Sequence, residues 1–255
     1  MKEIPLKKQA GLLFSEIWKP SVDWKLHTNA DIVTFNAFDN PDSNIRKKLK
    51  LQNTLYSDLT KTQDELFDEV KSKTYKYHIR RSLQDNIKVT LYSPSNLKSN
   101  EQIIRDLISC HHEMYKEKGM DVQLKDIEIF PYLYANALWI SVAETEEEPL
   151  VYHSYVDCGD TVRLLHSCSC FREKKDLAAL IGRANKRLHW DDILAFKKLG
   201  YTNYDWGGIA SFDNPNGIDL FKMSFGGKQH SYYKGQVGIT TKGAIMLKLY
   251  RIIKP

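Results

Sequence analysis

The spacing of hydrophobic positions changes several times along the chain and is easiest to interpret from Ile87 onward. Apolar residues three and four positions apart predict helices, and alternating apolar and polar residues predict strands. On this basis we predict the element order β-α-α-β-β-β-α-β-α-β-β from Ile87 to the end of the chain. The predicted strands are IKVTLY, WISVAE, PLVYHSYVD, VRLLHSCSCF, TNYDW, HSYY and IMLKLYRII.

The predicted helices of this region begin and end at recognisable residues. The first lies in NEQIIRDLISCHHEMYKEKG and ends at Gly119, a residue type that often terminates helices. The second covers LKDIEIFPYLYANA, with an irregularity at Pro131. The third spans about Ala184 to Lys198, before Gly200, and the fourth is GIDLFKMSF.

The part of the chain before Ile87 has a less regular pattern. DIVTFNAF and TLYSDL are predicted strands separated by the turn NPDS. The segment 62–65, TQDE, has the form of a capping box and predicts a helix through ELFDEVKSK. YKYHIRRSLQD predicts a second helix that leads into the strand at Ile87.

Composition limits the class of protein. A length of 255 residues suffices for one large domain or two small ones, and 42% hydrophobic residues is ordinary for a globular protein. The net charge of +5 suits an anionic ligand, but the basic residues form no long stripe, so we expect no nucleic-acid partner. With neither a signal-peptide pattern nor an apolar run long enough to cross a membrane, we expect a soluble cytoplasmic protein with reduced cysteines.

Two Gly-Gly pairs flank a predicted short helix in DWGGIASFDNPNGIDLFKMSFGGK, from Asp205 to Lys228. Glycine-rich turns beside helices often bind phosphate. A Walker loop is excluded, because Lys222 occupies the position of its first glycine and Gln229 that of its Ser/Thr. The dinucleotide fingerprint Gly-x-Gly-x-x-Gly is absent as well.

This stretch and the helix before it resemble the FemAB/FemX group of the GNAT acyltransferase superfamily. That group has a helix ending in glycine, a Tyr-Asp-x-Gly-Gly strand end and a Gly-x-x-x-Phe-Lys-x-x-Phe-Gly helix. The matching residues are Gly200, Tyr204, Asp205, Gly207, Gly208, Gly217, Phe221, Lys222, Phe225 and Gly226. The resemblance covers about residues 75–233. It implies an α/β (α+β) GNAT-like fold, with splayed strands in a mixed sheet, a complete unit over 87–255 and a partial second unit over 1–86.

The resemblance also implies where an acyl-CoA co-substrate would bind. Its pantetheine would lie between the splayed strands VRLLHSCSC and TNYDW, and its pyrophosphate at the N-terminus of the next helix. The GNAT phosphate loop is matched only loosely by 178–184, and Phe221 replaces a tyrosine that protonates the leaving thiolate in many relatives. The expected cofactor-binding residues are Ser167, Cys168, Ser169, Gly182, Arg183, Ala184, Asn185, Lys186, Asn214 and Lys222.

Asp205 and His166 are the expected catalytic residues. His166 titrates near working pH and can relay a proton from an attacking amine; the alternative is a hydrogen-bonded core histidine. Asp205 can accept or orient that proton, or else cap the Gly-Gly turn. Glu144 is a third candidate base, with a surface charge as the alternative. We expect no metal, because the spacing of His166, Cys168 and Cys170 fits no usual zinc pattern and buried cysteines are the simpler reading.

Arginines and aromatic residues are the candidates for binding the acyl acceptor. Arginine binds phosphate and aromatic rings stack on bases, although solvated charges and core packing are the ordinary alternatives. The expected residues are Arg80, Arg81, Tyr77, Trp24 and Trp206. Shorter members of the FemX-like group imply an N-acyltransferase that acts on a nucleotide-linked (dTDP) amino deoxysugar. The alternatives are a peptidyltransferase that uses aminoacyl-tRNA and a non-catalytic binding module. The sequence leaves the oligomeric state open.

Overall fold

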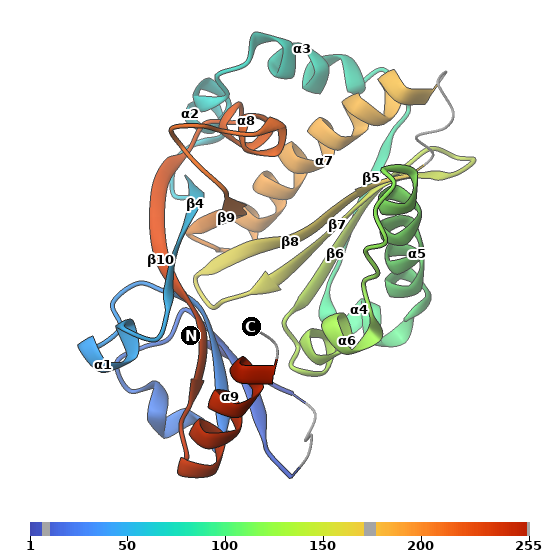
Figure 1. Ribbon diagram of the computed structural model, residues 1–255. Helices are drawn as coiled ribbons and strands as arrows, with labels where there is room; N and C mark the ends of the chain where they lie inside the picture. Colours follow the sequence, from blue (N-terminus) through green and yellow to red (C-terminus); the bar gives the residue numbers. More distant parts are fainter. Residues whose placement is uncertain (7–10, 171–176, 254–255) are drawn as a thin grey trace.

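A computed structural model describes residues 1–6, 11–170 and 177–253, and within these residues ten strands form one continuous sheet (Figure 1). In chain order the strands are β1 Lys2–Pro5, β2 Phe14–Trp18, β3 Ile32–Phe38, β4 Lys50–Asp58, β5 Lys88–Tyr92, β6 Leu138–Glu144, β7 Pro149–Asp157, β8 Thr161–Ser169, β9 Asn203–Ile209 and β10 Lys228–Gly238. Their spatial order is β1-β2-β3-β10-β4-β9-β8-β7-β6-β5. The pairs β2–β3 and β8–β9 are parallel and the other neighbouring strands are antiparallel.

The helices cover both faces of this sheet. In chain order they are η1 Trp24–His27, α1 Ser43–Arg46, α2 Gln63–Glu69, α3 Lys73–Ser82, α4 Pro94–Ser99, α5 Gln102–Glu117, α6 Asp126–Tyr134, α7 Ala178–Lys198, α8 Gly217–Met223 and α9 Thr241–Ile253. Helices α4, α5 and α6 lie on one side of strands β5–β8, and α3 and α7 lie on the other side (Figure 1). The capping box predicted at Thr62 and Glu65 is confirmed at the start of α2.

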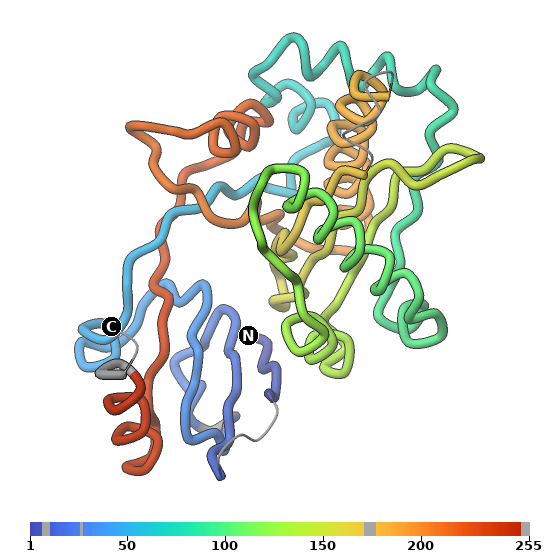
Figure 2. Tube along the Cα trace, turned by 45° about the vertical axis from the view of Figure 1, so that its right-hand side comes forward, coloured from blue at the N-terminus to red at the C-terminus, as the bar shows by residue number. Residues whose placement is uncertain are grey.

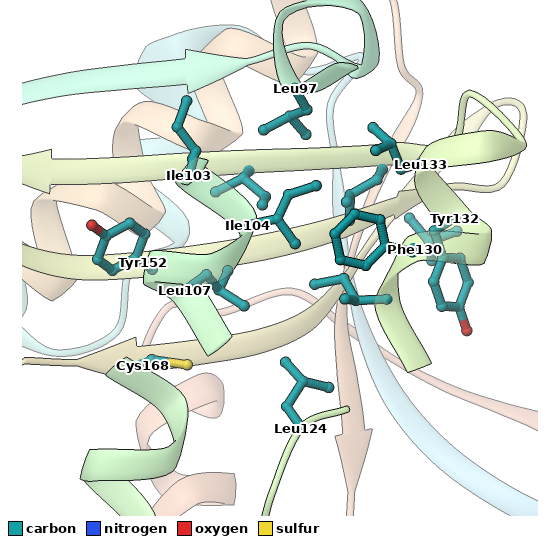
Figure 3. Packing of buried hydrophobic residues seen from close by; sticks show 14 of the residues in the cluster. Leu97, Ile103, Ile104, Leu107, Leu124, Phe130, Tyr132, Leu133, Tyr152 and Cys168 are labelled. Atoms are coloured by element: carbon teal, nitrogen blue, oxygen red, sulfur yellow. The ribbon is translucent and has the colours of Figure 1, made fainter. Parts of the chain in front are cut away.

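The hydrophobic core under α4–α6 shows why the predicted helix period holds there. Ile103, Ile104 and Leu107 turn from α5 toward the sheet, where Tyr152 and Cys168 meet them (Figure 3). Gly119 follows α5 with a φ of +71°, a conformation that glycine adopts without a steric penalty. This layer fixes one face of β7 and β8, the strands that lead to the candidate site.

The predicted order of strands is confirmed from β5 to β10, but the short helix α4 between β5 and α5 was not predicted, and the predicted last strand, IMLKLYRII, is wrong. This segment belongs to helix α9, in which Gly243 and Leu247, four residues apart, are buried. The hydroxyl of Thr240 accepts a hydrogen bond from the Gly243 N–H at 3.2 Å and caps the helix. A short apolar run fits a strand and a helix equally, and the polar residues before it decide between them.

Further differences concern the start of helix α7 and two strands near the N-terminus. Helix α7 begins at Ala178 and not near Ala184, because alanine and leucine favour the helix and Gly182 interrupts it at a cost of only ~1 kcal/mol relative to alanine. Strands β1 and β2 were not predicted. Phe171, the last residue of the predicted strand VRLLHSCSCF, lies outside the described residues.

The N-terminal segment and the end of the chain meet in the same part of the molecule. Strand β10 lies between β3 and β4, and β4 also pairs with β9. Helix α9 packs beside β10 and β3, as Figure 2 shows for the red end of the chain against the blue strands. The sheet thus continues from the 1–86 segment into the 87–255 segment; the division into two GNAT-like units stays a prediction.

Candidate functional site

The two central parallel strands, β8 and β9, separate after three paired positions. Their register runs from Thr161↔Asn203 to Arg163↔Asp205. Beyond these residues β8 continues to Ser169 beside β7, whereas β9 continues to Ile209 beside β4. The predicted splay is therefore present, and the facing edges of two strands open onto a gap.

A buried ion pair marks the point of separation. The Arg163 guanidinium donates to the Asp205 carboxylate over 2.5 Å, and their side chains are 8% and 1% exposed. The other carboxylate oxygen accepts from Thr54 at 2.5 Å and from the Gly207 N–H at 2.9 Å. Asp205 thus caps the Gly-Gly turn, one of the two roles expected for it, and both its oxygens are engaged before any ligand arrives.

Gly207 permits the close approach of the strands at this point. Its φ is +75°, and a Cβ atom at this position would lie 2.9 Å from the carbonyl oxygen of Leu164 on β8. Real Cβ atoms do not come so close to a backbone oxygen, and the positive φ disfavours other residues as well. The glycine predicted from the family motif therefore has a local physical reason.

A pocket of about 340 Å³ occupies the opening of the splay. We call it the splay pocket. Both separated strands, helices α5 and α8, and strands β2 and β10 contribute to its walls. The lining residues are Trp18, His111, Tyr115, Arg163, Leu164, Leu165, His166, Ser167, Trp206, Gly207, Gly208, Ile218, Lys222 and Lys234.

His166 lies in this pocket as a neutral imidazole. Its Nδ1 is 2.8 Å from the Ser154 hydroxyl on β7, and its ring is edge-on to that of His111 at 5.4 Å. Burial, together with the neighbouring His111, lowers the pKa of His166 to about 4. The Nε2 atom makes no hydrogen bond within the described chain, so the ring can accept a proton from a ligand.

Lys222 lies in the splay pocket opposite β8. Its ammonium donates to the Gly208 carbonyl at 2.8 Å. Burial, and then the charge of Arg163, lower its pKa to about 8, while Asp205 and Asp219 partly offset this effect. The group is still mostly protonated at neutral pH, and it can give up a proton near pH 8.

Ser167, Cys168 and Ser169 lie on β8 beyond the separation. Ser167 lines the splay pocket, whereas Cys168 is fully buried in the core beneath α5. The four cysteines are free and buried, which agrees with the ordinary core role. Among the described residues, no group of three or more His, Cys, Asp or Glu side chains is arranged to hold a metal ion.

The expected pyrophosphate residues on α7 have partners within the protein. Since α7 begins at Ala178, Gly182 to Lys186 lie beyond its first turn. Arg183 forms a bidentate ion pair with Asp85, at 2.5 and 3.0 Å. Lys186 donates to the Gly182 carbonyl at 2.8 Å, and its ammonium lies 4.9 Å from the centre of the Tyr75 ring.

The remaining two α7 residues face inward. Ala184 is buried, and the amide oxygen of Asn185 accepts a hydrogen bond from His153 Nε2 at 2.9 Å. Asn214, in the loop after β9, is exposed and does not line the splay pocket in the described chain. Glu144 pairs with Lys88 at 3.2 Å at the far end of β6, which agrees with a surface charge.

The predicted acceptor-binding residues are not brought together. Arg80 lines a separate pocket between α2, α3 and α7, and its guanidinium lies 5.0 Å from the centre of the Phe67 ring. Arg81 donates to Gln84 at 2.6 Å, and Tyr77 on the same helix is 61% exposed. Trp24 is buried against Phe35. Of the five, Trp206 borders the splay pocket, but it is fully buried and its indole N–H donates to Ser57 at 2.9 Å, which agrees with the core-packing alternative.

Several lining residues were missed from the sequence. An arginine within the apolar strand VRLLHS is a signal for a buried ion pair, and it could have identified Arg163. Trp18 and Lys234 come from opposite ends of the chain, and no local pattern connects them to β8. His111 and Tyr115 look like ordinary positions of an amphipathic helix.

A buried polar network supports the splay from the α7 side. One carboxylate oxygen of Asp192 lies within hydrogen-bonding distance of three side chains, at 2.5 to 2.9 Å. They are Ser141 on β6 and His153 and Tyr155 on β7. The Tyr155 hydroxyl is 3.0 Å from that of Tyr204 on β9. These side chains connect β7 to β9 across β8 and so hold β9 beside the point of separation.

With this geometry in place, the chain can be compared with known proteins. No protein-family model and no curated protein sequence matches it. Several solved structures match this chain. FemX gives a TM-score of 0.61 at 12% identity, covering 98% of this chain and 85% of FemX. The lysylphosphatidylglycerol synthetase (L-PGS) structure from Bacillus licheniformis gives 0.55 at 14% identity, covering 100% of this chain and 87% of that one.

The C-terminal domain of a candidate lysylphosphatidylglycerol synthetase from Agrobacterium fabrum gives a TM-score of 0.56 at 11% identity, covering 99% of this chain and 86% of that chain. The fold is GNAT-like and FemX-like. The expected mixed sheet with flanking helices is thereby confirmed. Among the described residues, no helix is both long and apolar enough to cross a membrane.

Proposed function

We propose that the protein is an acyltransferase that uses the splay pocket to move an acyl group from a thioester to an amine. The observation that carries this proposal is the separation of β8 and β9, because it leaves strand edges free on either side of a pocket that holds His166 and Lys222. An extended donor can lie along such an edge and pair with its backbone. The donor that we propose is acyl-CoA.

The chemistry follows from the groups that face the pocket. The acceptor nitrogen attacks the thioester carbonyl, a C–N bond forms, the C–S bond breaks, and the nitrogen loses a proton as the thiolate gains one. His166 is neutral at pH 7 and has one ring nitrogen available, so it accepts the proton of the amine. The Lys222 ammonium stabilises the negative charge that develops on oxygen and then sulfur.

Asp205 has a different task in this scheme. Its oxygens are held by Arg163, Thr54 and Gly207, so it positions the turn at residues 206–208 and does not itself receive the proton. For the donor's pyrophosphate we propose the N-terminal turn of α7, which begins at Ala178, because the helix dipole favours an anion there. For the acceptor we propose the amino group of a nucleotide-linked (dTDP) amino deoxysugar.

A second donor, aminoacyl-tRNA, is favoured by a separate observation. FemX and two lysylphosphatidylglycerol synthetase structures match with TM-scores above 0.5, and the name of the synthetases denotes an aminoacylated product. In addition, Arg183 and Lys186 are engaged within the protein and are not free to bind a pyrophosphate. In this case an aminoacyl ester takes the place of the thioester in the same pocket.

A transfer assay with both donors tests the proposal. The purified protein is incubated with a panel of acyl-CoAs and dTDP-amino sugars, and in parallel with charged tRNAs, and the products are identified by mass spectrometry. We expect an acceptor mass increased by the acyl group, together with free CoA. Transfer from charged tRNA alone would select the second donor. Ligand binding without transfer from either donor would contradict the proposal and leave a non-catalytic binding module.

A further inference from the structure

The splay pocket has an unbalanced charge. Among the described residues that line it, Arg163, Lys222 and Lys234 are cationic, two are imidazoles, and none is a carboxylate. The charge of Arg163 is matched by Asp205 directly behind it. The other two cations decide what kind of ligand the pocket can bind.

Neither lysine is neutralised by a carboxylate within hydrogen-bonding distance. Lys222 donates to a backbone carbonyl, which is uncharged. Lys234, exposed at the rim of the pocket on β10, has no hydrogen-bond acceptor or ion-pair partner in the described part of the chain. Burial and the charge of Arg163 lower the pKa of Lys234, and the charge of Glu16 on β2 partly offsets this. The Glu16 carboxylate already accepts hydrogen bonds from Tyr132 at 2.7 Å and from Asn36 at 3.3 Å. At least one positive charge therefore faces the pocket without a counterion.

The opposite wall contains a polar atom without a partner. His111 on α5 is 6% exposed and lines the pocket, and its Nδ1 is buried without a hydrogen bond in the described chain. This nitrogen has almost no accessible surface, so it lies behind the face of the wall, and other atoms of His111 line the pocket. His166 lies next to His111, with the two rings edge-on at 5.4 Å.

From these observations we infer that the splay pocket binds an oxyanion, a phosphate or a carboxylate, carried by the acceptor close to its nucleophile. Lys234 and Lys222 supply the positive charge. A volume of about 340 Å³ leaves room for such a group together with a sugar-sized or amino-acid-sized body. The role of the anion as part of an acceptor rests on the proposed transferase function; its binding does not.

Binding is tested without any donor, so that its outcome is independent of catalysis. Inorganic phosphate and acetate are titrated separately at constant ionic strength, with chloride as the reference salt, and the amide signals of Gly207 and Gly208 are followed by NMR. We expect saturable shifts with at least one of the two ions. A response to phosphate indicates a phosphorylated acceptor, and a response to acetate indicates a carboxylated one.

Charge variants then locate the ion. Lys234→Gln and Lys222→Gln are each expected to weaken binding about tenfold, the effect of one charged hydrogen bond. Lys228→Gln is the matched control, because Lys228 is an exposed lysine on the same strand that does not line the pocket. Lys234 is exposed, so its replacement leaves the fold intact. Absence of saturable shifts with both ions overturns the inference, as does an equal loss of affinity in Lys228→Gln.

Discussion

The carboxylate of Asp205 lies 2.5 Å from the guanidinium of Arg163 at the last position where β8 and β9 are paired. This ion pair joins the two strands immediately before they separate. Its burial means that each charge depends on the other, since neither has water to solvate it. The free energy of unfolding therefore reports on the ion pair that joins β8 and β9 at the point where they separate.

Asp205→Asn is expected to lower the free energy of unfolding by about 3–5 kcal/mol, because it leaves the Arg163 charge buried without a counterion. Urea unfolding followed by fluorescence measures the change. The control is Glu144→Gln, which breaks the more exposed Lys88 ion pair and should cost less than about 1 kcal/mol. Equal effects of the two substitutions would show that the buried pair has no special role.

Gly207→Ala should be much more destabilising than Gly208→Ala. The first places a Cβ 2.9 Å from the Leu164 carbonyl oxygen at a φ of +75°, whereas the second meets no atom within 4 Å. We expect a loss of at least about 1–2 kcal/mol for Gly207→Ala from the backbone conformation alone. Thermal unfolding of the two variants side by side gives the difference; similar melting temperatures would contradict the close approach of the strands.

The pKa of His166 predicts how stability changes with acidity. Its value is about 4 in the folded protein against 6.5 for an ordinary histidine, because burial and the neighbouring His111 disfavour the charged ring. Between these values the unfolded chain binds a proton that the folded chain does not, so stability falls as the pH is lowered from 6.5 toward 4.

His166→Gln removes this contribution, which reaches at most about 1.4 kcal/mol per pH unit. The difference in unfolding free energy between the variant and the wild type should therefore move in favour of the variant between pH 7 and pH 5. Chemical denaturation at several pH values measures it. A difference that stays constant over this interval would mean that His166 titrates normally.

Lys222 is expected to titrate near pH 8, well below an ordinary lysine at 10.5, because burial and Arg163 disfavour its ammonium. Reductive ¹³C-methylation followed by NMR gives the titration curve of each lysine, and Lys222→Arg identifies the signal. Asp205 and Asp219 act in the opposite direction, so Asp219→Asn should lower the midpoint further. A midpoint above 10 for Lys222 would show that burial and Arg163 do not disfavour its ammonium.

Much of the fold could be predicted because local sequence and tertiary environment agree. The helix period of α5 matches the core it covers, and Gly119, Gly200 and Thr62 stand at the boundaries that their conformations require. Helix α9 could not be predicted from its apolar residues. The start of the helix depends on the cap at Thr240, and its position depends on the close approach of Gly243 to Asp31.

Local sequence pointed to part of the lining of the splay pocket, and topology brings the other lining residues there. His166, Ser167, Trp206 and Lys222 lie in or beside the motif strands, and the structure places all four in the splay pocket. Trp18 and Lys234 reach the same pocket through β2 and β10, strands that are joined to the site by long-range pairing. Residues such as Arg80 and Arg183 have the right chemistry, but their partners and positions lie elsewhere.

The central claim is that the gap between β8 and β9 receives the acyl donor. The most direct test is a crystal structure of the protein with an unreactive analogue of the donor that the transfer assay identifies, such as an acyl-CoA thioether. The account predicts the donor chain alongside Leu164–Ser167 of β8, with its acyl group between His166 and Lys222. An analogue bound outside this gap, with the splay pocket unchanged, would contradict it.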